Sequence, residues 1–277
     1  MLRSMLVALD GSPYSEAASA LARDWAIRFD ARVLGLGILD EPSIDRAEPV
    51  PMGAYAFKTH RDEVRLADAH RRVLKFLAEF QARCAAQGVT AAVLEDVGDP
   101  IDRLLREAQR CDAVILGRET HFQFETQDRP DATLAGVIRG CARPVVVVPR
   151  DLPERRGVMV AYGGGRESAR TLQLFQLLGL SDGEPIDVVT IRPDPEEAAA
   201  VAGLASDFLT AHGAPHRVHA IASQASPADV LLEELHGRAP RLLVMGAHGH
   251  HPVRDLFTGS VTRGVLTRCS VPVFLGV

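Results

Sequence analysis

The chain has 277 residues, of which 47% are hydrophobic and 24% charged, and its formal net charge is −5 at pH 7. This length accommodates two domains of ordinary size, each able to bury a core. Residues 1–150 carry 20 Lys and Arg against 22 Asp and Glu, and residues 151–277 carry 11 against 14. Neither part has the basic excess of a nucleic-acid-binding protein, so we expect no nucleic acid partner.

The sequence indicates neither a membrane anchor nor a secreted, disulfide-bonded fold. No apolar run approaches the ~20 residues that a membrane helix needs, and the strand-like segment 5–9 leaves no room for a signal peptide. The four cysteines are far apart and lack the CxxC spacing of a zinc site. We therefore expect a cytoplasmic protein with no membrane partner.

Short β-branched runs alternate with helical patterns along the first part of the chain. The expected strands lie at 5–9, 32–39, 90–97, 113–116 and 145–148. A helix is predicted over 60–87, with Val73, Leu74, Leu77 and Phe80 on one buried face. Such alternation is typical of parallel sheets covered by helices on both faces, which bind ligands at the strand C-termini where the strand order switches.

A polar linker at 151–156 separates this pattern from a second copy of it. The matched segments are 5–12 with 158–165, 112–117 with 241–246, and 141–148 with 269–275. The first copy is longer by about 25 residues, which fall in a proline-rich excursion at 42–59 that has no helical or strand periodicity. A helix is expected over 166–178. We predict two tandem doubly wound α/β domains, 1–150 and 157–277, each with a five-stranded parallel sheet.

A glycine-rich loop in the second unit carries the candidate chemistry. It runs from Gly246-Ala-His-Gly249 through nine residues to Gly259-Ser260, which opens a helical stretch at 261–266. Glycines allow a close backbone approach, so successive amides can form an anion nest. Ser260 can cap the helix, whose free amides and dipole favour a second anion contact. Two such contacts suit a polyphosphate.

Other phosphate and nucleotide motifs are excluded. The second unit contains no lysine, and neither GxxxxGK[ST] nor a complete GxGxxG occurs in the chain. The neighbouring histidines His248, His250 and His251 lack a carboxylate or thiolate set, so no metal site is expected. Cys141 and Cys269 share a repeat position before the last strand and are interpreted as small core residues.

The loop, its flanking strands and the duplication together resemble the universal stress protein family in its tandem two-domain form. ATP-binding members carry GxxGx9G[ST] after the fourth strand, and Val7–Ser12 and Ser270–Phe274 are similar to the family's opening and closing strands. The resemblance covers nearly the whole chain. It implies a Rossmann-like, adenine nucleotide alpha hydrolase-like fold. It also implies a stress-response regulatory module that binds an adenine nucleotide, with ATP, with or without Mg, expected first.

The same resemblance assigns residues to the second site. The implied phosphate-binding residues are Gly246, Gly249, Gly259 and Ser260, and His248, Val261 and Thr262 line the same pocket. Ala161, Tyr162 and Ile191 are placed near the base and ribose. Closing strands at 145–148 and 271–275 are expected to pair across the two units, and a homodimer of the whole chain is expected as well.

Each unit departs from the family pattern in a different way. The first keeps Asp10, the family's base- and ribose-contacting acid, but Gly117–Thr120 lacks the second glycine, so this domain is expected to be largely structural. The second unit has Gly163 where the acid stands. A lost hydrogen bond of this kind costs about 1–2 kcal/mol, or roughly ten- to thirty-fold in affinity.

Several alternatives stay open on sequence grounds. The glycines can serve tight turns alone, and Asp10 can be a turn former. Slow ATPase or phosphotransferase activity is suggested by His248 and Asp255 within the loop, although phosphoryl transfer needs an oriented nucleophile and usually a metal. An interaction protein without a nucleotide is a third alternative. A further alternative is an anion clamp that replaces the lost glycines, formed by Arg118, Arg129, Arg139 and Arg143.

Overall fold

The computed structural model describes residues 1–41, 55–122, 133–247 and 260–276. The first half contains β1 (Ser4–Leu9), α1 (Pro13–Phe29), β2 (Arg32–Leu39), α3 (Tyr55–Ala86), β3 (Ala91–Val97), α4 (Pro100–Ala108), β4 (Ala113–Gly117), α5 (Thr133–Gly140) and β5 (Val145–Val148). The second half contains β6 (Val158–Ala161), α6 (Arg166–Leu178), β7 (Ile186–Arg192), α7 (Pro195–Ala211), β8 (His216–Ala222), α8 (Pro227–Arg238), β9 (Leu242–Gly246), α9 (Ser260–Arg268) and β10 (Val273–Gly276).

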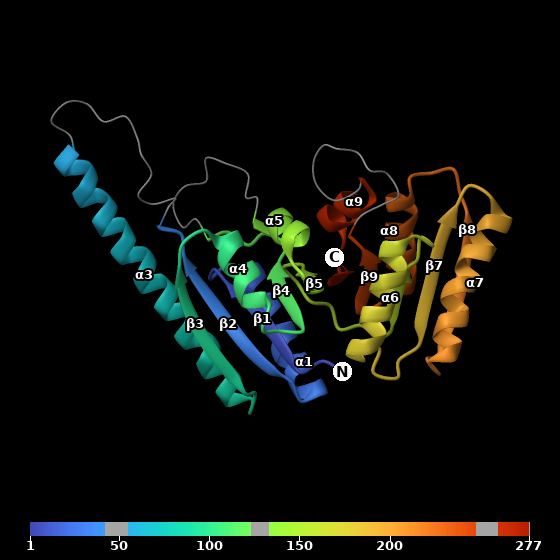
Figure 1. The fold of residues 1–277 in the computed structure, drawn as a ribbon, viewed down its shortest axis with the longest axis horizontal. Helices are drawn as coiled ribbons and strands as arrows, with labels where there is room; N and C mark the ends of the chain where they lie inside the picture. Colours follow the sequence, from blue (N-terminus) through green and yellow to red (C-terminus); the bar gives the residue numbers. More distant parts are fainter. Residues whose placement is uncertain (42–54, 123–132, 248–259, 277) are drawn as a thin grey trace.

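All of these strands belong to one ten-stranded sheet, in the order β3-β2-β1-β4-β5-β10-β9-β6-β7-β8. Neighbouring strands are parallel within each half, and β5 pairs antiparallel with β10, with Val147 opposite Val273 and Val145 opposite Leu275. Figure 1 shows the two halves on either side of this seam. The predicted pair of five-stranded parallel sheets is confirmed, and so is the pairing of the closing strands.

Local sequence explains where the elements lie. Every residue of β1 and β5 is buried, as expected of continuous apolar strands that are covered on both faces. α1 begins where the Ser12 hydroxyl accepts a 3.1 Å hydrogen bond from the Ser15 amide, with Pro13 at the first helical position. It ends at Asp30, which has a left-handed φ of 52°.

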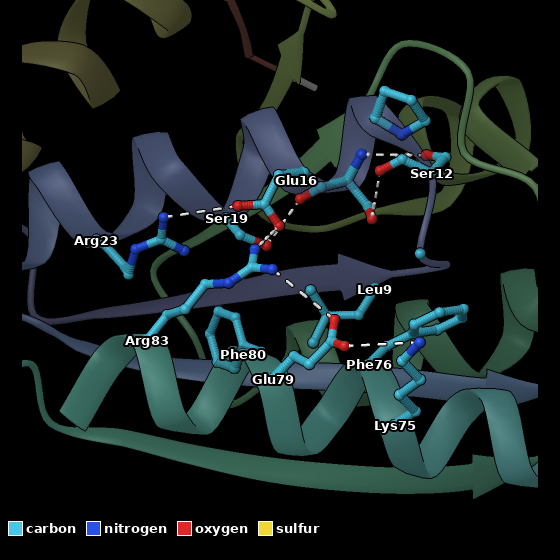
Figure 2. Close-up of a pocket in the computed structure, with 13 residues that line it drawn as sticks. Leu9, Ser12, Glu16, Ser19, Arg23, Lys75, Phe76, Glu79, Phe80 and Arg83 are labelled. Carbon is cyan, nitrogen blue, oxygen red and sulfur yellow. Dashed lines mark hydrogen bonds and ion pairs between the residues drawn. The ribbon is translucent and has the colours of Figure 1, made fainter. Parts of the chain in front are cut away.

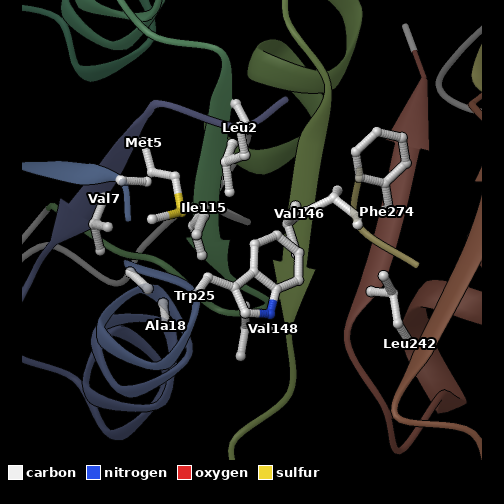
Figure 3. Close-up of a cluster of buried hydrophobic side chains, with 14 of the residues drawn as sticks. Leu2, Met5, Val7, Ala18, Trp25, Ile115, Val146, Val148, Leu242 and Phe274 are labelled. Atoms are coloured by element: carbon white, nitrogen blue, oxygen red, sulfur yellow. The ribbon is translucent and has the colours of Figure 1, made fainter. Parts of the chain in front are cut away.

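Helices cover both faces of the sheet, and equivalent helices of the two halves share a face. Buried residues of α1, α3, α6 and α7 belong to one core cluster, and those of α4, α5, α8 and α9 belong to the other. The first cluster continues across the seam, where Trp25 of α1 and Val148 of β5 lie in one cluster with Phe274 of β10 (Figure 3). The Phe274 ring meets Phe175 of α6 edge to face, with centroids 5.9 Å apart.

The structure corrects two of the predictions about α3. The helix begins at Tyr55, so the last residues of the excursion predicted at 42–59 are helical. Leu74 is 46% exposed, whereas the other three residues predicted on its face are buried. Leu74 follows Val73 directly and is therefore rotated about 100° away from it around the helix axis. Helix 166–178 is confirmed as α6. Within the described residues, no helix has the length and apolarity needed to cross a membrane.

An ionic cluster joins the halves beside the seam. The Glu184 carboxylate, just before β7, accepts hydrogen bonds from Arg28 of α1, Arg241 and the Gly157 amide, each at 2.8 Å. Burial opposes ionisation of Glu184, but the hydrogen bonds from Arg28, Arg241 and Gly157 outweigh it and lower the pKa from 4.5 to about 2. This carboxylate therefore stabilises the fold when it is ionised.

Replacing Glu184 with Gln should lower the free energy of unfolding by about 1–3 kcal/mol at pH 7, because two arginines lose a charged acceptor. The pKa of Glu184 is lower in the folded state, so its contribution is present above pH 4.5 and is lost as the pH falls toward 2. Urea denaturation of wild type and E184Q should give curves that converge between these pH values. E233Q, which alters an exposed carboxylate on α8, is the control, and an equal loss in both variants would contradict the assignment.

Candidate functional site

The loops after β6 and β9 meet at the switch in strand order of the second half. β6 lies between β7 and β9, and Ala161 at its end is opposite Met245, one residue before Gly246. β6 is followed by Tyr162 and three glycines, and Gly165 caps α6 without a side-chain hydrogen bond. The carboxyl ends of β6 and β9 therefore bring a glycine turn and the start of α6 together, which is where such sheets bind ligands.

Gly246 is packed closely against the first turn of α6. A Cβ atom at this position would lie 3.2 Å from the Glu167 carbonyl carbon and 3.2 Å from the Ser168 nitrogen. Gly164 has a φ of +71°, and a Cβ there would lie 2.7 Å from the Val201 side chain. Both positions therefore favour glycine for steric reasons, independent of any ligand.

A buried hydrogen bond joins the two ends of the predicted phosphate loop. The Thr262 hydroxyl, in the first turn of α9, donates to the Ala247 carbonyl oxygen at 3.1 Å, and Thr262 is 1% exposed. Ser260 is exposed at the start of α9, and Val261 is half-buried. The structure thus places Gly246 and the first turn of α9 together. His248, Gly249 and Gly259 lie outside the described residues.

The residues predicted near the base and ribose lie on neighbouring strand ends. Ala161, Ile191 and Val261 are all partly buried and pack against the same core cluster, on the α8 and α9 side of the sheet. Tyr162 is buried, and its burial raises the pKa of the phenol. Its carbonyl accepts a 3.0 Å hydrogen bond from the Thr190 hydroxyl, which fixes the strand end. Ala161, Ile191 and Val261 form an apolar wall beside the switch, whereas Tyr162 packs in the other core cluster, on the α6 and α7 side of the sheet.

Arg192, at the end of β7, was not predicted from the sequence. Its guanidinium donates to the Gly163 carbonyl, and its Nε donates to Glu197 Oε1 at 3.0 Å. Gly163 is the position where the family's acid is missing. An arginine therefore lies where the sequence predicts only a lost acceptor. The sequence signal that could have identified Arg192 is its position as the last residue of β7, the second strand of the second half.

In the first half, Asp10 is used to hold the protein's own backbone. Asp10 is 5% exposed, and its carboxylate accepts from the Ser12 amide at 2.9 Å and from the His121 amide at 2.6 Å. The loop after β4 is further fixed by the Thr120 hydroxyl, which donates to the Gly117 carbonyl at 2.9 Å. Phe122 is 1% exposed. This arrangement fits the turn-forming alternative for Asp10.

The anion clamp proposed for the first half is not supported where its arginines can be followed. Arg118 donates to the carbonyls of Thr267 and Cys269 in the second half, and Arg143 donates to the Gln109 carbonyl at 3.1 Å. These side chains bind backbone oxygens and are not directed together at a shared ligand. Arg129 lies outside the described residues. The expectation for Cys141 and Cys269 is confirmed, because both are buried.

A separate cleft of about 360 Å³ lies between α1 and α3 (Figure 2). Its cations pair with its carboxylates. Glu16 binds Arg83 and lies 3.8 Å from Arg23, and Glu79 lies 3.9 Å from Lys75. This network joins the two helices and pairs the cations with carboxylates, so the three cations and two carboxylates of the lining leave a net charge of only +1 for an anion. No group of three metal-ligating side chains occurs among the described residues.

Comparisons with known proteins point to one family over nearly the whole chain. A model described as the universal stress protein family matches residues 1–149 and again residues 154–275. The universal stress protein Slr1230 of Synechocystis is 26% identical over 285 residues, covering 98% of this chain and 99% of that protein. A universal stress protein of Archaeoglobus fulgidus superposes with a TM-score of 0.71 at 20% identity, covering 98% of this chain and 97% of that one. A further A. fulgidus universal stress protein, solved in complex with dAMP, is 22% identical with a TM-score of 0.36 and covers 43% of this chain and 96% of its own.

Replacing Asp10 with Ala should destabilise the protein by about 1–3 kcal/mol, because the His121 amide loses its acceptor. Nucleotide affinity should change by less than about twofold, because the carboxylate is engaged by the first half's own backbone and can affect the second half only indirectly, through the loop that carries Arg118. Chemical denaturation measures the first effect and calorimetric titration the second. D24A, at an exposed position on α1, is the control. A variant of unchanged stability and weakened nucleotide binding would show that Asp10 contacts a ligand.

Proposed function

Because the chain belongs to the universal stress protein family, in its tandem form, we propose that it is a stress-response regulatory module that binds an adenine nucleotide. ATP is the first candidate. The proposed site lies in the second half, at the ends of β6 and β9. The first half is proposed to be largely structural, and the proposed domain bounds remain 1–150 and 157–277.

The observation that carries this proposal is the hydrogen bond between Thr262 and the Ala247 carbonyl. It holds Gly246 and the first turn of α9 next to each other, although thirteen residues separate Gly246 from Ser260 along the chain. The Ala247 amide donates to the Gly276 carbonyl, so we propose that the amides that follow Ala247, together with those at the start of α9, contact the same polyphosphate. The positive end of the α9 dipole favours that charge. Backbone amides suffice here, which accords with the absence of lysine from the second half's sequence.

The nucleoside end of the proposed site is supported by Ala161, Ile191 and Val261, while Tyr162, which was also expected there, packs on the opposite face of the sheet. Apolar side chains on the ends of neighbouring strands suit a flat base, and Arg192 supplies a donor beside Gly163 where the family's acid is missing. A donor in place of an acceptor changes which edge of a base or which ribose oxygen is recognised. Mg²⁺ that accompanies ATP would take its ligands from the phosphates and water. We propose binding as the activity; the alternative of slow hydrolysis rests on His248 and Asp255, which lie outside the described residues.

Cytoplasmic location is part of the proposal. Burial raises the pKa of all four thiols, and for Cys111 to about 11, so each is a protonated core residue. Such thiols fit a reducing compartment.

Wild-type protein should bind ATP in calorimetric titration, and G246V should lose that heat. A Val side chain at Gly246 would collide with the first turn of α6 and displace the end of β9 from which the proposed phosphate loop starts. G237V is the matched control, because a Cβ at Gly237 meets no atom within 4 Å. Mass spectrometry of the natively purified protein should also show a bound adenine nucleotide. Absence of heat and of thermal stabilisation at saturating ATP would contradict the proposed function.

We also propose a homodimer of the whole chain. β5 and β10 pair with each other, so a second copy has to use another surface, and β3 and β8 are the strands at the outer edges of the sheet. Light scattering across a range of concentrations should give twice the chain's mass of 29.9 kDa. A mass of one chain at every concentration would rule the dimer out.

A further inference from the structure

Arg118 connects the first half to the second. It follows β4 directly, and its amide donates to the Val148 carbonyl at 2.8 Å. Its side chain crosses the seam, where Nη1 donates to the Thr267 carbonyl at 3.3 Å and Nη2 donates to the Cys269 carbonyl. The antiparallel register makes this contact possible, because the carboxyl end of β5 lies beside the segment that leads into β10.

The carbonyls that Arg118 contacts lie at the end of α9. Thr267 belongs to its last turn, and Cys269 follows its last residue. The last carbonyls of a helix have no partner within the helix and carry the negative end of its dipole. A guanidinium that donates to two of them is a charged, geometrically specific cap. The opposite end of this nine-residue helix, about 13 Å away, is Ser260 at the proposed phosphate site.

The segment that carries Arg118 is firmly held. Asp10 binds the His121 amide, and Thr120 binds the Gly117 carbonyl. Tyr14 has a raised pKa, first because of its burial and then because of its hydrogen bond with Glu119. The loop after β4, which corresponds to the second half's phosphate loop, is therefore a fixed base for the Arg118 side chain.

This side-chain contact runs only from the first half to the second. Ala247 holds the equivalent position in the second half, and its amide donates to the Gly276 carbonyl at 3.1 Å as the Arg118 amide does to Val148. A methyl side chain cannot reach across the seam. Arg118 of the first half therefore caps α9 of the second half, which has the complete glycine spacing. The second half has only Ala247 at the equivalent position, so it makes no such contact in return.

We propose that Arg118 is a positioning residue for nucleotide binding, through which the first half sets the position of α9. This inference rests on the proposed function. Fixing both ends of α9, by Arg118 at its C-terminus and by Thr262 near its N-terminus, orients the first-turn amides toward the phosphates. Without Arg118 the helix shifts or frays, and those amides meet the phosphates in a poorer geometry.

The test compares R118L and R118K with wild type, with R143L as the matched control. Arg143 also donates to a carbonyl at a helix end, that of Gln109, but within the first half. Hydrogen exchange of the amides in residues 261–269, without nucleotide, should be about tenfold faster in R118L and unchanged in R143L. Calorimetry should show about fivefold weaker ATP binding in R118L. R118K keeps the charge but contacts fewer carbonyls, so its values should lie between those of wild type and R118L.

The outcomes separate this inference from the proposed function. If wild type binds ATP and R118L binds it equally well, Arg118 is not a positioning residue, whatever happens to the exchange of α9. If R143L weakens binding as much as R118L does, the effect is a general loss of stability and the inference is overturned. A wild-type protein that binds no adenine nucleotide overturns the proposed function and the inference with it.

Discussion

The antiparallel pairing of β5 with β10 is the constraint on which the rest of the structure depends. Each half, taken alone, ends in an apolar strand with one unpaired side, which would be an open edge prone to association. Pairing the two edges gives the backbone N–H and C=O groups of both strands hydrogen-bond partners and makes a single ten-stranded sheet. It also puts equivalent helices on the same face, so the core continues from Trp25 to Phe274 without interruption. Glu184, Arg28 and Arg241 then bind across a seam whose geometry the strands have already set.

Against this symmetric frame, the two halves use equivalent positions differently. Asp10 in the first half holds the His121 amide, and Gly163 in the second half leaves a carbonyl that Arg192 binds. Both oxygens of Asp10 already accept backbone hydrogen bonds and the side chain is 5% exposed, so little of the carboxylate is left for a ribose hydroxyl to reach. The loss of the second glycine in the first half and the engagement of Asp10 are therefore consistent changes. Both favour a rigid, ligand-free loop over an open one.

Much of the fold was predictable because its signals are local. Strands such as Val145–Val148 are continuous apolar runs, and the repeat of strand, turn and closing segment gave the tandem organisation. The early start of α3 at Tyr55 was missed because prolines just before it obscure any helical period. Leu74 was misplaced because a short apolar run does not show which of two adjacent leucine or valine residues faces the sheet.

The candidate site was predictable only as a set of positions. Glycines and Ser260 have a characteristic spacing, but the contact between Thr262 and Ala247 depends on how α9 returns to the end of β9. Arg192 and Arg118 gave no motif, because an arginine's partner is set by its place in three dimensions and both bind backbone carbonyls. A carbonyl has no sequence signature. Contacts of this kind become visible only once the fold has placed a strand end or a helix end within reach.

Those carbonyl contacts add to what a domain proposed to be largely structural contributes. If the first half contributed only buried apolar surface at the seam, it would stabilise the second half as a whole and would not act on any one helix in particular. Asp10 instead holds the loop after β4, and Arg118 of that loop donates to carbonyls at the end of α9, the helix that opens at Ser260. Ala247 makes no reciprocal contact through its side chain. The first half therefore bears on one defined element of the second, through an arginine at the position that Ala247 holds in the second half.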